Sequence, residues 1–147
     1  MLPLLEAHNM VRVVHTRMGL ENVHADMCSD ADVLVLCGGD GTIHHAINRI
    51  GLENLKDVQM AVLPCGSSNG LATCLCDSLE GAVANILFGR VVHFDALELA
   101  FEEPGGHHRI VHELQVAAFG IIAEHDYLQV RFIEMEPSAH KLTTFQI

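Results

Sequence analysis

Two glycine-rich loops, each placed at the end of an apolar segment, constrain the fold of this chain more than any other feature. The first, Gly38–Thr42 (GGDGT), follows the continuous apolar run Val33–Cys37. The second, Gly66–Asn69 (GSSN), follows Met60–Leu63 after Pro64 and a cysteine. Short apolar runs of this kind are typical of parallel strands covered on both faces. The sequence therefore predicts two buried strands that each end in a glycine loop.

The segment between the two loops has the period of a helix. Apolar residues fall at positions i, i+3, i+4 and i+7 of one helical face, and Gly51 is placed to end the helix: Ile43, Ala46, Ile47 and Ile50. Strand, helix and strand form a βαβ unit with a right-handed crossover. Both loops then lie at the carboxyl ends of neighbouring parallel strands, where open α/β sheets bind ligands.

The composition of the loops indicates phosphate binding. Glycine lets backbone N–H groups approach a polyphosphate closely, and the N-termini of two following helices add partial positive charge. The glycines in question are Gly38, Gly39, Gly41 and Gly66. Neither loop has the Lys-Ser/Thr pair of a P-loop or the spacing of the dinucleotide-binding G-x-G-x-x-G motif. The alternative is that both loops are only tight turns.

Polar side chains in the loops suggest further roles. Asp40 is suited to position Mg²⁺ or to accept a proton from a hydroxyl, or it is simply a turn-forming residue. Thr42 and Asn69 are expected to cap the two following helices. Ser67 and Ser68 offer hydroxyl donors to a phosphate.

Taken together, Gly38–Thr42 and Leu63–Ala72 (LPCGSSNGLA) resemble the catalytic domain of the diacylglycerol kinase and sphingosine kinase superfamily. NAD kinases and phosphofructokinases carry loops similar to GGDGT, and the LPxGSxNxLA stretch favours the lipid kinases. The resemblance implies ATP and Mg²⁺ as cofactors and transfer of the γ-phosphoryl group to a lipid hydroxyl. It implies that Asp40 is the catalytic and metal-binding residue and that both loops bind the nucleotide.

A later segment bears on the lipid substrate. Residues 118–126 resemble the part of sphingosine kinases where a carboxylate meets the head group of a sphingoid base. The resemblance implies that Asp126 and Phe119 bind substrate and that Arg131 contacts phosphates. Asp126 could equally be a carboxylate at a helix start. A sphingoid base is the expected acceptor, with diacylglycerol and ceramide as alternatives.

The remaining elements define the expected domains. Residues 11–16 are expected to form a strand and 18–27 a helix, and a helix over 79–87 is expected to start at Ser78 and end at Gly89. Strands are expected over 91–101 and 110–122, with a turn or hairpin loop over 102–108. The fold class is therefore α/β: a Rossmann-like parallel-sheet nucleotide domain (1–90), then the beginning of a β-rich lipid-binding region (91–147).

Some positions depart from the family pattern, which the chain follows over roughly residues 10–132. Family members have a glutamate where His45 stands and glycines where Arg49 and Ser68 stand. Arg49 should either hinder packing or face water. An earlier strand and a later acidic glycine motif of the family are not seen. The chain is thus expected to be truncated or divergent, and a catalytically impaired nucleotide-binding protein or interaction module is the alternative to an active kinase. A kinase of the NAD kinase type is a third candidate for the function of the chain.

Composition limits the partners. A net charge of −11 argues against a nucleic acid, whose phosphates require a basic surface. No apolar run reaches the roughly 18 residues that span a bilayer. The five cysteines include no C-x-x-C pair and are expected to be reduced thiols of a cytoplasmic protein. Peripheral membrane contact through the strands after residue 91 is expected, and the sequence indicates no oligomeric state.

Overall fold

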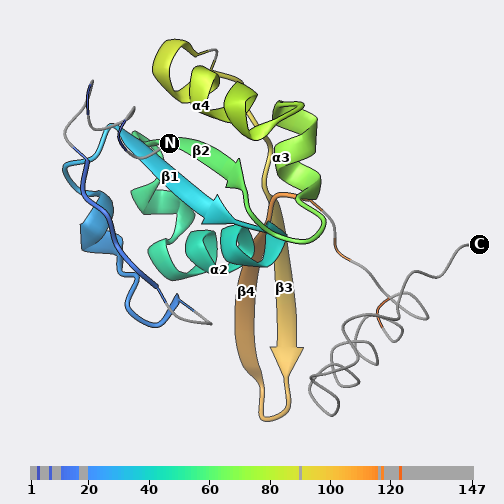
Figure 1. The fold of residues 1–147 in the computed structure, drawn as a ribbon. Coiled ribbons are helices and arrows are strands. Elements are labelled where there is room, and N and C mark those ends of the chain that lie inside the picture. Colours follow the sequence, from blue (N-terminus) through green and yellow to red (C-terminus); the bar gives the residue numbers. More distant parts are fainter. Residues whose placement is uncertain are drawn as a thin grey trace, which may run out of the picture. The chain divides into compact units, whose positions relative to one another are not determined.

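The computed structural model describes residues 11–16, 20–89 and 91–115, together with the single positions 3, 7, 117 and 123. Apart from 117 and 123, these residues belong to one compact unit, residues 1–115. Its elements, labelled in Figure 1, are η2 (Ala25–Cys28), β1 (Val33–Gly38), α2 (Asp40–Ile50), η3 (Leu52–Asn54), β2 (Gln59–Pro64), α3 (Gly70–Leu75), α4 (Leu79–Phe88), β3 (Leu97–Glu103) and β4 (His107–Glu113).

The predicted βαβ unit is confirmed. Strands β1 and β2 pair in parallel, with Val33 opposite Gln59 and Gly38 opposite Pro64, and α2 connects them. Both strands therefore end at the same edge of the sheet, and each runs directly into its glycine loop (Figure 1). The α/β fold class predicted from the sequence is correct.

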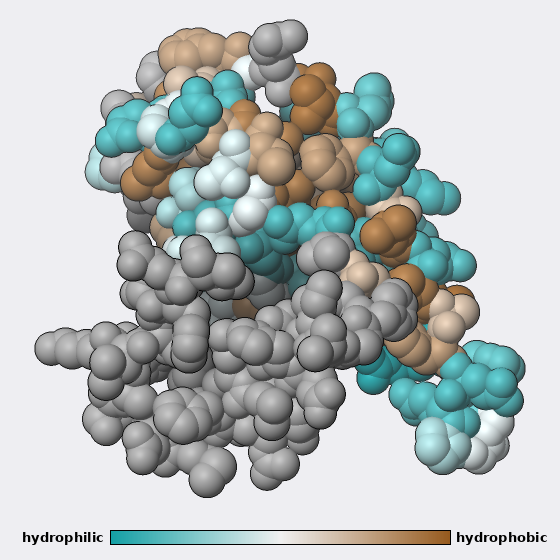
Figure 2. All heavy atoms as spheres, turned by 90° about the vertical axis from the view of Figure 1, so that its right-hand side faces the viewer, coloured by the Kyte–Doolittle hydropathy of each residue, from teal (hydrophilic) through white to brown (hydrophobic). Residues whose placement is uncertain are grey.

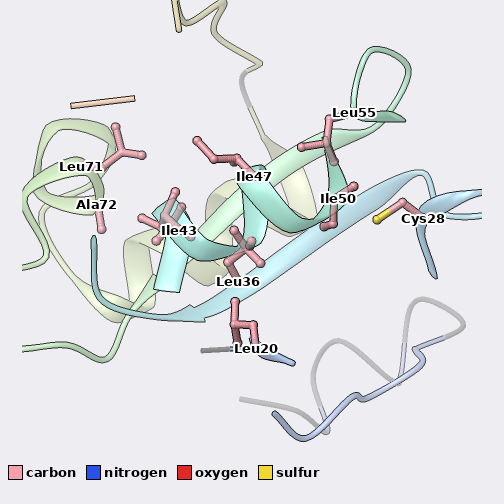
Figure 3. Packing of buried hydrophobic residues seen from close by; sticks show 11 residues of the cluster. Leu20, Cys28, Leu36, Ile43, Ile47, Ile50, Leu55, Leu71 and Ala72 are labelled. Atoms are coloured by element: carbon pink, nitrogen blue, oxygen red, sulfur yellow. The ribbon is translucent and has the colours of Figure 1, made fainter. Parts of the chain in front are cut away.

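The core lies on both faces of this sheet. Leu36 and Val62 pack against α2, whose four predicted apolar residues are all buried; Ile47 is 0% exposed. Figure 3 shows the buried cluster around α2 and the strands, with Leu36, Ile43, Ile47 and Ile50 among its labelled side chains. On alternate strand positions, Val35 and Leu63 pack against α4 instead. Because successive strand residues point to opposite faces, the continuous apolar runs are explained by helices on both sides.

Helix α4 begins and ends where the sequence predicts. The hydroxyl of Ser78 accepts a hydrogen bond from the Gly81 N–H (3.0 Å), and Gly89 follows the last turn. In the same way α2 ends at Gly51, whose φ of 85° is readily adopted only by glycine.

Strands β3 and β4 form the predicted hairpin, with Leu97 opposite Glu113. Its turn carries Gly105 and Gly106, both at positive φ (99° and 78°). Figure 2 shows hydrophilic residues gathered at the tip of this hairpin. The bounds differ from the prediction: β3 begins at Leu97 and continues to Glu103, and β4 runs from His107 to Glu113, so the turn is shorter than the predicted 102–108. Of the rest of the predicted strand 110–122, residues 116 and 118–122 lie outside the described residues. Residues 91–96 are exposed and have no partner strand among the described residues. Valine and phenylalanine in this segment favour a strand, but without a partner that preference is not sufficient to form one.

The prediction for the start of the chain was wrong in two respects. Residues 11–16 are exposed and irregular, because no described strand pairs with them. In place of the helix predicted over 18–27, residues 20–27 contain 3₁₀ structure at Leu20 and in the short helix Ala25–Cys28 and are otherwise irregular, while residues 18 and 19 lie outside the described residues. The domain boundary near residue 91 stays a prediction. Within the described residues no helix is long and apolar enough to cross a membrane.

The hairpin is attached to α2 by the side chain of Asn48. Its amide nitrogen donates to the carbonyl of His112 and its amide oxygen accepts from the His112 N–H, both at 2.8 Å. One turn earlier on α2, His44 Nδ1 lies 2.7 Å from a carboxylate oxygen of Glu113. Asn48 thus pairs with β4 as a neighbouring strand would, and it binds the hairpin to the helix that follows the first glycine loop.

Replacing Asn48 with alanine is expected to lower the free energy of unfolding by about 1–3 kcal/mol, because both backbone groups of half-buried His112 lose their partner. Urea denaturation followed by circular dichroism measures this change. Asn85→Ala is the matched control, since Asn85 lies exposed on α4 and its side chain makes no hydrogen bond to a described residue. Equal effects of the two substitutions would contradict the role given to Asn48.

Candidate functional site

The two glycine loops meet backbone to backbone. The Cys65 N–H donates to the Gly38 carbonyl at 3.2 Å. A Cβ atom on Gly66 would overlap the Cα of Gly39 and lie 2.9 Å from its nitrogen, and a Cβ on Gly39 would lie 3.0 Å from the Gly66 Cα. Side chains at these two positions would separate the loops, so glycine is required there for close approach.

The carboxylate of Asp40 joins the first loop to the helix that follows the second. One oxygen accepts from the Gly70 N–H at 2.9 Å and the other from the Leu71 N–H at 3.1 Å. These are the first two residues of α3, whose N–H groups have no partner within the helix. Asp40 is half-buried, and it caps α3 from a position 30 residues earlier in the chain.

Gln115 completes this arrangement. Its side-chain amide is oriented so that both its nitrogen and its oxygen have a partner. The nitrogen donates to an Asp40 carboxylate oxygen at 3.0 Å, and the oxygen accepts from the Leu71 N–H at 2.8 Å. Gln115 was not predicted as a site residue. It lies two residues beyond β4, and nothing in the local sequence indicates a contact with loops so distant in the chain.

The two predicted helix caps differ from expectation. The N-cap of α2 is Gly39, and Thr42 lies within the first turn, where its side chain fills the space that a Cβ on Gly38 would occupy. Asn69 is the N-cap residue of α3, at φ 53°, but its side chain binds Gly66 instead of the helix. Its amide oxygen accepts from the Gly66 N–H and its nitrogen donates to the Gly66 carbonyl, both at 2.7 Å. Asn69 therefore closes the second loop on itself.

Several donors at the loops remain free to bind a ligand. The backbone N–H groups of Asp40 and Gly41, at the start of α2, make no hydrogen bond among the described residues. The backbone N–H groups of Ser67 and Ser68 likewise make no hydrogen bond among the described residues. Both serines are exposed, so their hydroxyls are further donors at the surface. A Cβ on Gly41 would meet nothing within 4 Å. These donors are of the kind that binds phosphate oxygens at a helix N-terminus.

The described residues contain no group of three or more side chains that could hold a metal ion alone. Asp40 is the carboxylate within the loops, and both its oxygens already accept backbone hydrogen bonds. Mg²⁺ commonly binds through one carboxylate, waters and the phosphates of its nucleotide. The residues present are therefore compatible with a metal that arrives with a nucleotide, and Asp40 is the residue that would hold it.

The three departures from the family pattern are accommodated without strain. His45 and Arg49 are exposed on α2, so Arg49 faces water and does not hinder packing. Ser68 is exposed, and the positive φ of the second loop falls on Asn69 and not on Ser68. The loop thus does not require glycine at position 68. Phe119, Asp126 and Arg131 lie outside the described residues, and their roles stay predictions.

A parallel sheet with two glycine loops at one edge, joined through a capping aspartate, is an α/β arrangement of the kind that binds ligands at the carboxyl ends of its strands. The diacylglycerol kinase catalytic domain model matches residues 1–99, which include both loops. The chain therefore belongs to the diacylglycerol kinase catalytic domain family, the lipid kinases that include the sphingosine kinases. Neither a curated protein nor a solved structure gave a match.

Proposed function

We propose that this domain binds ATP and transfers its γ-phosphoryl group to the hydroxyl of a sphingoid base. Membership in a lipid kinase family supports the reaction class. The choice of a sphingoid base rests on the resemblance of residues 118–126 to sphingosine kinases.

The observation that carries the proposal is the set of free donors where the loops meet. N–H groups from the start of α2 and from Ser67 and Ser68 lie on two loops that touch at Gly39 and Gly66. A polyphosphate that crosses this junction would receive hydrogen bonds from both loops and the partial positive charge of α2. The carboxylate of Asp40 keeps the second loop and α3 in place for this contact.

Catalysis would consist mainly of positioning and charge neutralisation. The lipid hydroxyl oxygen attacks the γ-phosphorus, and the bond from that phosphorus to the β–γ bridging oxygen breaks to release ADP. The hydroxyl proton passes to the carboxylate of Asp40 or to solvent. Mg²⁺, when bound with the nucleotide, neutralises charge on the phosphates. The donors of the two loops bind the phosphate oxygens while this charge shifts.

A nucleotide-binding protein without turnover is the second candidate. The observation in its favour is that both oxygens of Asp40 accept hydrogen bonds from α3, which is what a purely structural aspartate would do. His45 in place of the family glutamate points in the same direction.

The test is phosphoryl transfer from labelled ATP with Mg²⁺ to sphingosine, ceramide and diacylglycerol, each in mixed micelles. We expect labelled product from sphingosine and a smaller amount or none from the other two lipids. Product from diacylglycerol or ceramide alone would overturn the choice of substrate. If the chain binds ATP but forms no product from any of the three lipids, the result would contradict a kinase and support the second candidate, a nucleotide-binding protein without turnover.

Membrane contact by the hairpin is part of the same proposal. Leu97, Phe101 and Ile110 are each at least 40% exposed on the two strands. Apolar side chains exposed this way suit a protein that must reach a lipid acceptor in a cytoplasmic membrane leaflet. Flotation with sphingosine-containing liposomes tests it, and a chain that stays in the bottom fraction would contradict it.

A further inference from the structure

The thiols of Cys37 and Cys65 lie in contact at the point where the two glycine loops begin. Their sulfur atoms are 3.3 Å apart, and both residues are exposed. Cys37 is the last residue but one of β1, and Cys65 directly follows β2. The other three cysteines show no such pairing: Cys28 is buried, Cys74 is exposed on α3, and the Cys76 thiol donates to the Ala72 carbonyl.

The backbone holds the two thiols together. In the parallel register Cys37 lies opposite Leu63, two residues before Cys65. The Cys65 N–H then donates to the carbonyl of Gly38, the residue after Cys37. A disulfide has a sulfur–sulfur distance of about 2.0 Å, so bond formation requires the 3.3 Å contact to shorten by about 1.3 Å. Rotation of two exposed side chains can supply most of that movement.

We propose that Cys37 and Cys65 form a reversible disulfide that ties the two glycine loops together at their base. The oxidant is a hydroperoxide such as hydrogen peroxide. This inference concerns the thiols alone and does not depend on the kinase activity proposed above.

The chemistry proceeds in two steps. A thiolate attacks one peroxide oxygen, the O–O bond breaks, and the products are a sulfenic acid and, after protonation, one water. The second sulfur, having lost its proton, attacks the sulfenic sulfur and displaces hydroxide, which leaves as a second water. Two thiols are oxidised and one peroxide is reduced to two waters. A dithiol reductant reverses the bond by exchange.

Partial burial of the sulfur raises the pKa of Cys37, and the contact with Cys65 raises it further. The thiolate is the nucleophile. Either sulfur can attack the peroxide first, and the other sulfur then resolves the sulfenic acid.

The experiment treats the full chain at low concentration with hydrogen peroxide, blocks remaining thiols with N-ethylmaleimide, and maps disulfides by mass spectrometry of non-reduced digests. Trypsin separates the pair, because Arg49 and Lys56 lie between the two cysteines. We expect a 37–65 link in the wild-type protein, a mass lower by about 2 Da before alkylation, and full reversal by dithiothreitol. The melting temperature should rise by roughly 5–10 °C on oxidation, since the bond closes a long loop.

Three variants test the assignment. Cys37→Ser and Cys65→Ser should each form no link, and each should leave a sulfenic acid at the remaining cysteine of the pair that dimedone traps. Cys74→Ser, the matched control at another exposed cysteine, should form the link as the wild type does. The proposal is overturned if the wild type forms no link, links Cys74 or Cys76 instead, or forms only disulfides between chains.

Discussion

Replacing Gly66 with alanine is expected to separate the two glycine loops and to lower the free energy of unfolding by about 3 kcal/mol, near the upper end of the usual cost of overpacking. The new Cβ would overlap the Cα of Gly39, which is backbone and cannot rotate away. The hydrogen bonds between Gly66 and Asn69, and between Cys65 and Gly38, would be disturbed by the same movement. Urea denaturation measures the loss.

Gly41→Ala is the matched control for this substitution. Gly41 belongs to the first loop, yet a Cβ there meets no atom within 4 Å, and the residue lies in helix α2. Alanine should therefore leave stability unchanged or raise it by about 0.5–1 kcal/mol. If the Gly66→Ala and Gly41→Ala variants have the same free energy of unfolding, the result would contradict the close packing of the two loops.

Replacing Asp40 with alanine should reduce phosphoryl transfer at least about 100-fold, the lower range for removal of a proton acceptor or of one charge-stabilising group. It should also cost about 1–3 kcal/mol of stability, because the N–H groups of Gly70 and Leu71 lose their acceptor. Steady-state assays with the lipid acceptor and urea denaturation give the two values. Asp57→Ala, at an exposed turn aspartate, is the control and should change neither.

The same variant separates two roles of Asp40. If Asp40 acts only by capping α3, Asp40→Ala weakens ATP binding by the same factor with and without Mg²⁺. If Asp40 also binds the metal, as we expect, the loss is larger when Mg²⁺ is present. Isothermal titration of ATP under both conditions distinguishes them, and equal factors would contradict the metal role.

The sequence was sufficient to predict the elements that its own periodicity specifies. The faces of α2, the strands before each loop, the cap at Ser78 and the glycine turn of the hairpin all follow from local patterns. The irregular segment 11–16 shows the limit of such patterns. Its residues favour a strand, but a strand forms only where a partner supplies hydrogen bonds, and partners are set by tertiary structure.

The contacts within the site could be predicted only in part. The position of both loops at one edge follows from parallel pairing, so their proximity was expected. Three contacts were not expected: Asp40 caps α3, Asn69 binds Gly66, and Gln115 reaches Asp40. Each depends on distances between backbone segments, and the order of residues does not reveal those distances. Asp40 and Asn69 thus make structural contacts that the sequence did not predict, and their roles in binding and catalysis stay predictions.

The most direct test of the central claim, that the two loops form one nucleotide site, is an NMR titration of the ¹⁵N-labelled chain with ATP and Mg²⁺. We expect the amide signals of Asp40 and Gly41 in the first loop and of Ser67 and Ser68 in the second to shift together along one binding curve. The amides of the hairpin tip, Gly105 and Gly106, should not move. Shifts confined to one loop, or saturating ATP with no change at either, would contradict the claim.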